Sequence, residues 1–98
     1  MKNFSYQLGI DVAKDTLDFT LLQAGKKLYY QRIDNTPKAV QSYLQQLEKQ
    51  GIALIDILFC MEHTGVYNAH VLAVLIKLEC SMWIEVDATR PLFVSRNL

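Results

Sequence analysis

The segments YQLGID (residues 6–11) and IDILFCME (residues 55–62) decide the fold, because each is a mostly apolar run that ends in a carboxylate. Apolar runs of this length are typical of buried β-strands. An ionised carboxylate at the end of a buried strand is costly unless a positive charge pairs with it. If the two strands lie side by side, Asp11 and Glu62 could share a divalent metal ion. That arrangement is used in metal-dependent cleavage of phosphodiester bonds.

The composition limits the chain to one small domain and excludes several classes of protein. The 98 residues are 51% apolar, which is enough for a core, and the formal net charge is +0. Neither half is strongly basic, which argues against a self-sufficient DNA-binding module but not against the catalytic part of a larger one. Cys60 and Cys80 lie in apolar runs, so reduced cysteines are expected. No signal peptide or membrane span is expected, which favours the cytoplasm.

The first third of the chain predicts three strands. Residues 6–11 form the first, and the alternation of polar and apolar residues over 16–21 predicts the second. The polar turn Ala24-Gly25-Lys26 leads into a third strand over residues 27–33. We expect these strands to form an antiparallel meander.

A helix, a strand, a second helix and a last strand are expected next. Pro37 suits the first helical position, with Asn35 or Thr36 as the cap and Gly51 at the end. The apolar strand over 55–62 is expected to be covered on both faces. Thr64 can cap a helix that runs to about Leu78 and is apolar almost all round. A strand follows over 81–86, and residues 91–98 are expected to begin another helix.

The predicted order is therefore β-β-β-α-β-α-β, an α/β protein with a ribonuclease-H-like mixed sheet. The two crossover helices place successive strands in parallel. The first strand then lies centrally, beside the strand that follows the first helix. Asp11 and Glu62 come together at the carboxyl ends of these neighbours, where open α/β sheets place their sites.

Three segments resemble insertion-sequence 110 family transposases, which share an amino-terminal domain with the Piv-type DNA invertases. The first is Gly9-Ile10-Asp11-Val12-Ala13-Lys14, and the second is Met61-Glu62-His63-Thr64-Gly65-Val66-Tyr67, which matches a Glu-x-Thr-Gly-x-Tyr pattern. The third is Asn35-Thr36-Pro37, which is followed by a predicted helix and also fits the family. The first segment alone is weakly specific, but the pair is fairly specific.

The resemblance implies a RuvC-like domain with four acidic metal ligands of DEDD type. Asp11 matches the first and Glu62 the second, as catalytic residues that bind Mg²⁺ or Mn²⁺. The family's last two acids would lie beyond Leu98, and its serine nucleophile belongs to a further domain. Residues 1–98 are thus expected to be the amino-terminal portion of an incomplete catalytic domain, truncated before its final helix. We expect it to be inactive alone and to bind metal weakly or not at all.

The resemblance also implies partners and a function. The parent protein would be a DNA transposase or site-specific recombinase that cleaves and rejoins transposon ends and target DNA, with a guide-like RNA in the full-length protein. Lys14, His63 and Thr64 are candidates for nucleic-acid contact. Apolar surface left uncovered by truncation predicts a homo-oligomer. The location would be the bacterial or archaeal cytoplasm, beside the nucleoid.

Several alternatives remain open from the residues themselves. Asp11 could cap the turn that follows it, Glu62 could be a first-turn acid of the second helix, and Lys14 and His63 could simply face solvent. Asp15 and Asp18 are expected to be turn and exposed-strand residues. Trp83 is expected to pack in the core or at an edge, with base stacking as the alternative.

Other functions with a similar fold are also possible. They are a Holliday-junction-resolvase-like nuclease fragment and a non-catalytic interaction module. An actin-like or sugar-kinase ATPase is disfavoured, because residues 12–15 after Asp11 contain no glycine to approach a phosphate.

Overall fold

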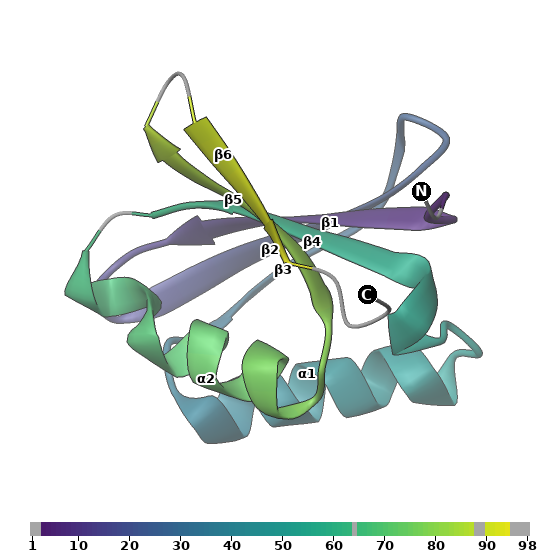
Figure 1. The fold of residues 1–98 in the computed structure, drawn as a ribbon. Helices are drawn as coiled ribbons and strands as arrows, with labels where there is room; N and C mark the ends of the chain where they lie inside the picture. The colour runs from purple at the N-terminus through teal and green to yellow at the C-terminus, as the bar shows by residue number, and fades with distance from the viewer. Residues whose placement is uncertain (1–2, 64, 88–89, 95–98) are drawn as a thin grey trace.

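Six strands form one mixed sheet, and the helices lie on one side of it (Figure 1). The computed structural model describes residues 3–63, 65–87 and 90–94. The elements are β1 (Tyr6–Val12), β2 (Thr16–Gln23), β3 (Lys26–Asp34), α1 (Pro37–Lys49), η1 (Leu54–Asp56), β4 (Ile57–Glu62), η2 (Val66–Asn68), α2 (Ala69–Lys77), β5 (Ser81–Asp87) and β6 (Arg90–Val94).

The strand order is β3-β2-β1-β4-β5-β6, which confirms the predicted meander and crossovers. β1, β2 and β3 are antiparallel neighbours. β4 is parallel to β1 and to β5, and α1 and α2 lie in the connections that lead into β4 and β5. β1 is therefore central, and its carboxyl end lies beside the carboxyl end of β4.

Local sequence explains the turn between β2 and β3. Gln23 pairs with Lys26, so the loop contains only two residues. Ala24 and Gly25 both have positive φ, at 52° and 77°. Two-residue hairpin loops favour this left-handed backbone because it matches the twist of the flanking strands.

Helix α1 begins and packs as its sequence predicts. Thr36 is the N-cap, and its Oγ1 accepts a hydrogen bond from the Ala39 amide at 3.1 Å. Pro37 occupies the first turn, where its missing N–H is no loss. The buried stripe is the predicted one, namely Val40, Tyr43, Leu44 and Leu47.

The core lies between the helices and one face of the sheet. Alternate residues of each central strand point into it, as the two-residue period of a strand requires. The largest side chains with under 2% exposure include Phe19, Phe59, Leu8, Leu17, Leu21, Leu44, Ile57, Leu75 and Met82. Tyr43 of α1 packs on Phe19 of β2 with ring centroids 4.4 Å apart.

The expectation that β4 is covered on both faces is wrong for the residues that the structure describes. Ile57, Phe59 and Met61 are buried under the helices, whereas Leu58 and Cys60 on the other face are only half-buried. Both α-helices lie on the same side of the sheet (Figure 1). The continuous apolar run of β4 therefore does not indicate two covering layers, because Leu58 and Cys60 face the uncovered side.

The second helix starts later than expected. A short 3-10 turn over Val66–Asn68 precedes α2, and Thr64, the expected cap, lies outside the described residues. The helix was expected to be apolar nearly all round and well buried. It buries Val71, Val74 and Leu75 but leaves Ile76 61% exposed, so only one face is packed.

The helix expected from Pro91 onward is not formed within the described residues. Arg90–Val94 is instead an edge strand, β6, antiparallel to β5. β5 offers a free edge of backbone donors and acceptors, and a proline is tolerated on an edge strand. The last four residues of that prediction, 95–98, lie outside the described part of the chain. No helix within residues 3–63, 65–87 and 90–94 is long and apolar enough to cross a membrane.

Candidate functional site

Five charged side chains form one row across the uncovered face of the sheet, one from each of five neighbouring strands. Asp18 pairs in register with Arg32 of β3 on one side and with Asp11 of β1 on the other. Ile10 pairs with Met61, so Asp11 lies beside Glu62 of β4, one residue further along both parallel strands. Glu62 in turn pairs with Glu85 of β5. We call Asp11, Glu62 and Glu85 the acidic row.

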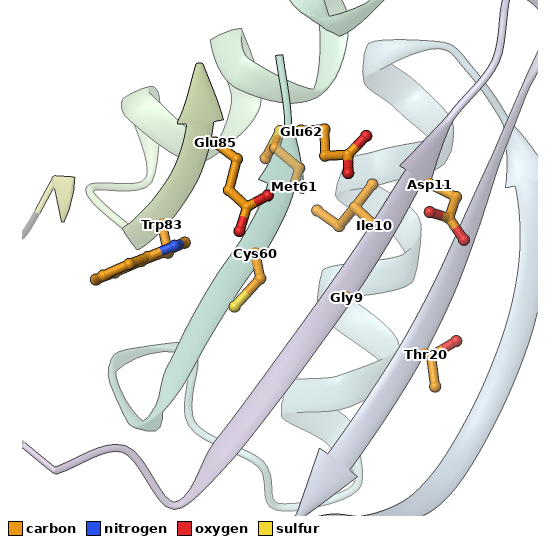
Figure 2. Close-up of a pocket in the computed structure, with 9 residues that line it drawn as sticks. All are labelled: Gly9, Ile10, Asp11, Thr20, Cys60, Met61, Glu62, Trp83 and Glu85. Atoms are coloured by element: carbon orange, nitrogen blue, oxygen red, sulfur yellow. The ribbon is translucent and has the colours of Figure 1, made fainter. Parts of the chain in front are cut away.

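Asp11 and Glu62 line the same hollow of about 250 Å³ (Figure 2). The two predicted site residues therefore lie on the same face of adjacent strands, as the sequence predicts. Gly9 precedes Asp11 by two residues on the same face of β1, and it has no side chain to fill the hollow. A Cβ built there would meet nothing nearer than the Thr20 carbonyl oxygen at 3.9 Å. The remaining lining residues are Ile10, Thr20, Cys60, Met61, Trp83 and Glu85.

The carboxylates of the acidic row have no side-chain partners in the described part of the chain. No hydrogen bond or ion pair is made by Asp11, Glu62 or Glu85 side chains there, and all three are exposed. No three His, Cys, Asp or Glu residues within 3–63, 65–87 and 90–94 converge closely enough to hold a metal ion. The acidic row therefore offers at most a pair of carboxylate ligands to one ion.

Asp18, the other acid of the row, is fully engaged. Arg32 donates from Nε to Oδ1 at 2.8 Å and from Nη2 to Oδ2 at 3.3 Å, and the Tyr30 hydroxyl also donates to Oδ1. The Arg32 and Tyr30 donors hold the pKa of Asp18 below its usual value. Both carboxylate oxygens of Asp18 are therefore already hydrogen-bonded and are not free to bind a cation. This agrees with the prediction that Asp18 is an exposed-strand residue.

Two asparagines hold the loops at the carboxyl ends of β1 and β4. Asn35 is 6% exposed, and its Nδ2 donates to the carbonyls of Ala13 at 2.8 Å and Tyr67 at 3.0 Å. It therefore ties the turn after Asp11 to the segment after Glu62. The buried Asn68 side chain donates to the Glu62 carbonyl at 2.9 Å. The sequence predicted Asn35 or Thr36 as the cap of α1, which Thr36 confirms, and it did not predict that Asn35 joins these loops.

The residues predicted to contact nucleic acid are exposed where they are described. Lys14 lies in the turn after β1, and His63 follows Glu62 directly. The His63 amide donates to the Glu85 carbonyl at 2.9 Å, which extends the pairing of β4 with β5. Thr64 lies outside the described residues.

Sequence reasoning missed Glu85 as a neighbour of the site. Its signal was the alternation of β5, where Trp83 and Glu85 share the face opposite Met82 and Ile84. Figure 2 shows Glu85 and Trp83 adjacent on this strand, with Cys60 between Trp83 and Gly9. Burial and the nearby Glu85 charge raise the pKa of the Cys60 thiol.

The solved structures that resemble this chain in fold include two bacterial proteins. One is a protein of actin-like ATPase fold and unknown function from Bacteroides thetaiotaomicron, with a TM-score of 0.59 and 14% identity over 79% of this chain and 30% of that one. The other is YeaZ from Pseudomonas aeruginosa, with a TM-score of 0.53 and 20% identity over 86% of this chain and 45% of that one. The chain thus spans less than half of either structure, and the likeness concerns the fold alone.

Comparisons of sequence identify the family. No curated protein matches the chain. A family model described as "Transposase", of the DEDD group of insertion sequence 110, matches residues 8–89, which include all of the acidic row. The chain therefore belongs to the DEDD transposase family of insertion sequence 110.

Proposed function

We propose that this chain supplies Asp11 and Glu62, as ligands of Mg²⁺ or Mn²⁺, to the metal-assisted cleavage and rejoining of DNA strands, and that it is inactive alone. The observation that carries the proposal is the placement on adjacent strands, facing one hollow, of two carboxylates that have no side-chain partner among the described residues. They lie at the carboxyl ends of parallel strands, the usual position of a site in an open α/β sheet.

The finer fold assignment is also part of the proposal. We infer a ribonuclease-H-like, RuvC-like domain from the central β1, its antiparallel meander and the two parallel strands that follow. An actin-like ATPase fold shares this strand arrangement, and the family match favours the transposase over an ATPase. The turn after Asp11 supports that choice, because residues 12–15 include no glycine.

The donor set fits a hard cation. Mg²⁺ prefers carboxylate oxygens, keeps several waters, and is usually bound by one or two carboxylates together with substrate phosphates. A bound divalent ion would supply charge stabilisation for the oxygens that attack and leave the phosphorus. Asp11 and Glu62 would hold it, while Asn35 and Asn68 keep the ends of β1 and β4 in place through the bonds described above.

DNA is the substrate of the family, and the other partners are proposals. Lys14 and His63 lie on exposed loops near Asp11 and Glu62, which supports the proposal that they contact phosphates of the strand being cleaved. A guide-like RNA partner and self-association of the chain extend the same proposal. Such an enzyme would act where the DNA is, in the cytoplasm of a bacterial or archaeal cell.

Paramagnetic NMR tests the metal site even if binding is weak. Titration with Mn²⁺ is expected to broaden the amide signals of residues near Asp11 and Glu62, and Mg²⁺ in excess is expected to reverse the effect. Asp11→Asn and Glu62→Gln should each lower the Mn²⁺ affinity at least about tenfold, because each removes one of two charged ligands. Glu48→Gln, an exposed acid on α1, is the matched control and should leave the affinity unchanged.

Uniform weak broadening in all these variants would overturn the metal assignment. That result would favour a non-catalytic module, the alternative with the same fold and no need for the carboxylates. A loss of broadening confined to the Asp11 and Glu62 variants would support the proposed chemistry.

A further inference from the structure

The hollow that the acidic row lines is also lined by a second row of residues, which form its floor and one wall. In register across the sheet this row runs Thr20, Gly9, Cys60, Trp83 and Phe93. Gly9 leaves the floor open, and Trp83 of β5 forms one wall. The row lies two residues before the acidic row on β1, β4 and β5, which is about 7 Å along the strands.

Aromatic packing holds Trp83 in place on the side of β6. Its ring packs on Phe93 of β6 with centroids 6.3 Å apart and a tilt of 51°. Phe93 in turn packs edge to face on Phe4, at 6.5 Å and 70°. Trp83 is half-buried, so part of its ring remains open to the hollow. An aromatic ring fixed in this way loses little further freedom when a ligand stacks on it.

The polar groups around the ring accept hydrogen bonds. Glu85 and Glu62 present carboxylates without a side-chain partner in the described part of the chain, and Thr20 presents a hydroxyl. No lysine, arginine or histidine lines the hollow among the described residues. An anionic ligand is therefore disfavoured there, and a flat neutral ring with hydrogen-bond donors at its edge is favoured.

We propose that this hollow binds an unstacked base of single-stranded DNA, stacked on Trp83, with its exocyclic amino group donating to Glu85. The inference rests on the proposed function, because DNA is the substrate of the family and the acidic row would hold a phosphate through its metal ion. The spacing of about 7 Å between the two rows is comparable to the reach from a phosphate to the base of the same nucleotide. Cytosine, adenine and guanine each carry an exocyclic amino group, whereas thymine does not.

The chain contains one tryptophan, so tryptophan emission, excited selectively over that of the tyrosines, reports on Trp83 alone. The first experiment titrates the 98-residue protein with d(C)5 in Mg²⁺ and follows Trp83 emission. The comparison ligand is an abasic deoxyribose-phosphate chain of the same length and charge. We expect d(C)5 to change the emission and to bind about 5–150-fold more tightly than the abasic chain, which corresponds to the worth of stacking one base.

Variants distinguish stacking on Trp83 from nonspecific binding of the oligonucleotide. Binding is measured by the fluorescence anisotropy of a labelled oligonucleotide. Trp83→Leu is expected to weaken d(C)5 binding by about 5–150-fold, whereas Trp83→Phe keeps an aromatic face and loses less. Tyr29→Leu is the matched control, because Tyr29 is an aromatic side chain of β3 that is 55% exposed and lies outside the hollow. Glu85→Gln should reduce the preference for d(C)5 over d(T)5.

Two outcomes would overturn the inference: equal affinity for d(C)5 and the abasic chain, or an unchanged Trp83 emission at saturation. If Trp83→Leu unfolds the protein, as circular dichroism would show, Trp83→Phe and the abasic comparison still decide. The result is separable from the proposed function, because Mn²⁺ broadening near Asp11 and Glu62 is measured without DNA. If that broadening were absent but d(C)5 still bound, the base-binding proposal would hold and the metal-assisted chemistry would be contradicted.

Discussion

The two faces of the sheet are built from alternate residues of the same strands, yet they differ in kind. The helix-covered face contains Leu8, Phe19 and Phe59, each with 1% exposure or less. The uncovered face contains the acidic row and the hollow beside it. The covered face therefore holds the fold together, and the uncovered face is free to carry chemistry that would be costly in a core.

The uncovered face also differs from one end of its charged row to the other. Asp18 and Asp11 lie directly opposite each other on β2 and β1. Asp18 has donors from Arg32 and Tyr30, whereas Asp11 has none within the described residues. The two acids occupy matching positions but differ in role: Asp18 stabilises the hairpin, and Asp11 remains available for a ligand.

The largest effect should come from the covered face. Phe59→Ala is expected to lower the free energy of unfolding by about 3–5 kcal/mol, because it leaves a cavity in the core. Cys60→Ala changes the next residue, which faces the other way, and should cost about 1 kcal/mol or less. Urea unfolding followed by circular dichroism measures both. Similar losses in the two variants would contradict the contrast between the faces.

A smaller effect is expected at the loops that flank the site. Asn35→Ala removes two hydrogen bonds to the Ala13 and Tyr67 carbonyls and should cost about 1–3 kcal/mol. Amide NMR signals on both loops should shift. Thr36→Ala is the control, since it removes only the cap of α1 and should cost about 1 kcal/mol without moving those signals. Unmoved loop signals in Asn35→Ala would show that Asn35 does not join the loops.

The paired end of the row should respond to acid. The pKa of Asp18 is lowered from 3.8 by its bonds with Arg32 and Tyr30. The stability that this ion pair adds is therefore present above about pH 4 and is lost as the pH falls through the lower folded value. Arg32→Gln should be less stable than the original protein at pH 7, with the difference shrinking in strong acid. A difference that is constant with pH, measured by urea unfolding, would argue against the pair.

The smallest effect at neutral pH concerns Tyr43, on the covered face. Burial raises the pKa of Tyr43 to about 12, so its neutral form is favoured in the folded state. The linked stability is present below about pH 10 and is lost as the pH rises toward 12. Tyr43→Phe should change little at pH 7 and should lose less stability than the original protein above pH 10. Parallel losses in the two proteins would contradict this.

Much of the fold could be predicted because its signals are local. The alternation in β2, the Gly-containing turn after it, and the Thr36-Pro37 start of α1 each depend on a few neighbouring residues. The placement of Asp11 beside Glu62 followed from strand order alone. Their role as metal ligands stays a prediction.

The parts that could not be predicted depend on distant partners. Pro91 suits the start of a helix as well as an edge strand, and the free edge of β5 decides between them. The apolar run of β4 does not reveal which faces are covered. Glu85 looks like an ordinary exposed-strand acid until the register sets it opposite Glu62. Register between strands far apart in sequence is what local patterns do not contain.

The tight turn at Ala24 and Gly25 has a practical consequence. It lies six residues from Asp18 along β2, or about 20 Å, at the opposite end of the strand from the charged row. Its two residues project beyond the last paired positions of the hairpin. An affinity tag or a surface tether inserted there would leave the approach to Asp11 and Glu62 unobstructed, which makes this turn a suitable anchor for single-molecule experiments with DNA.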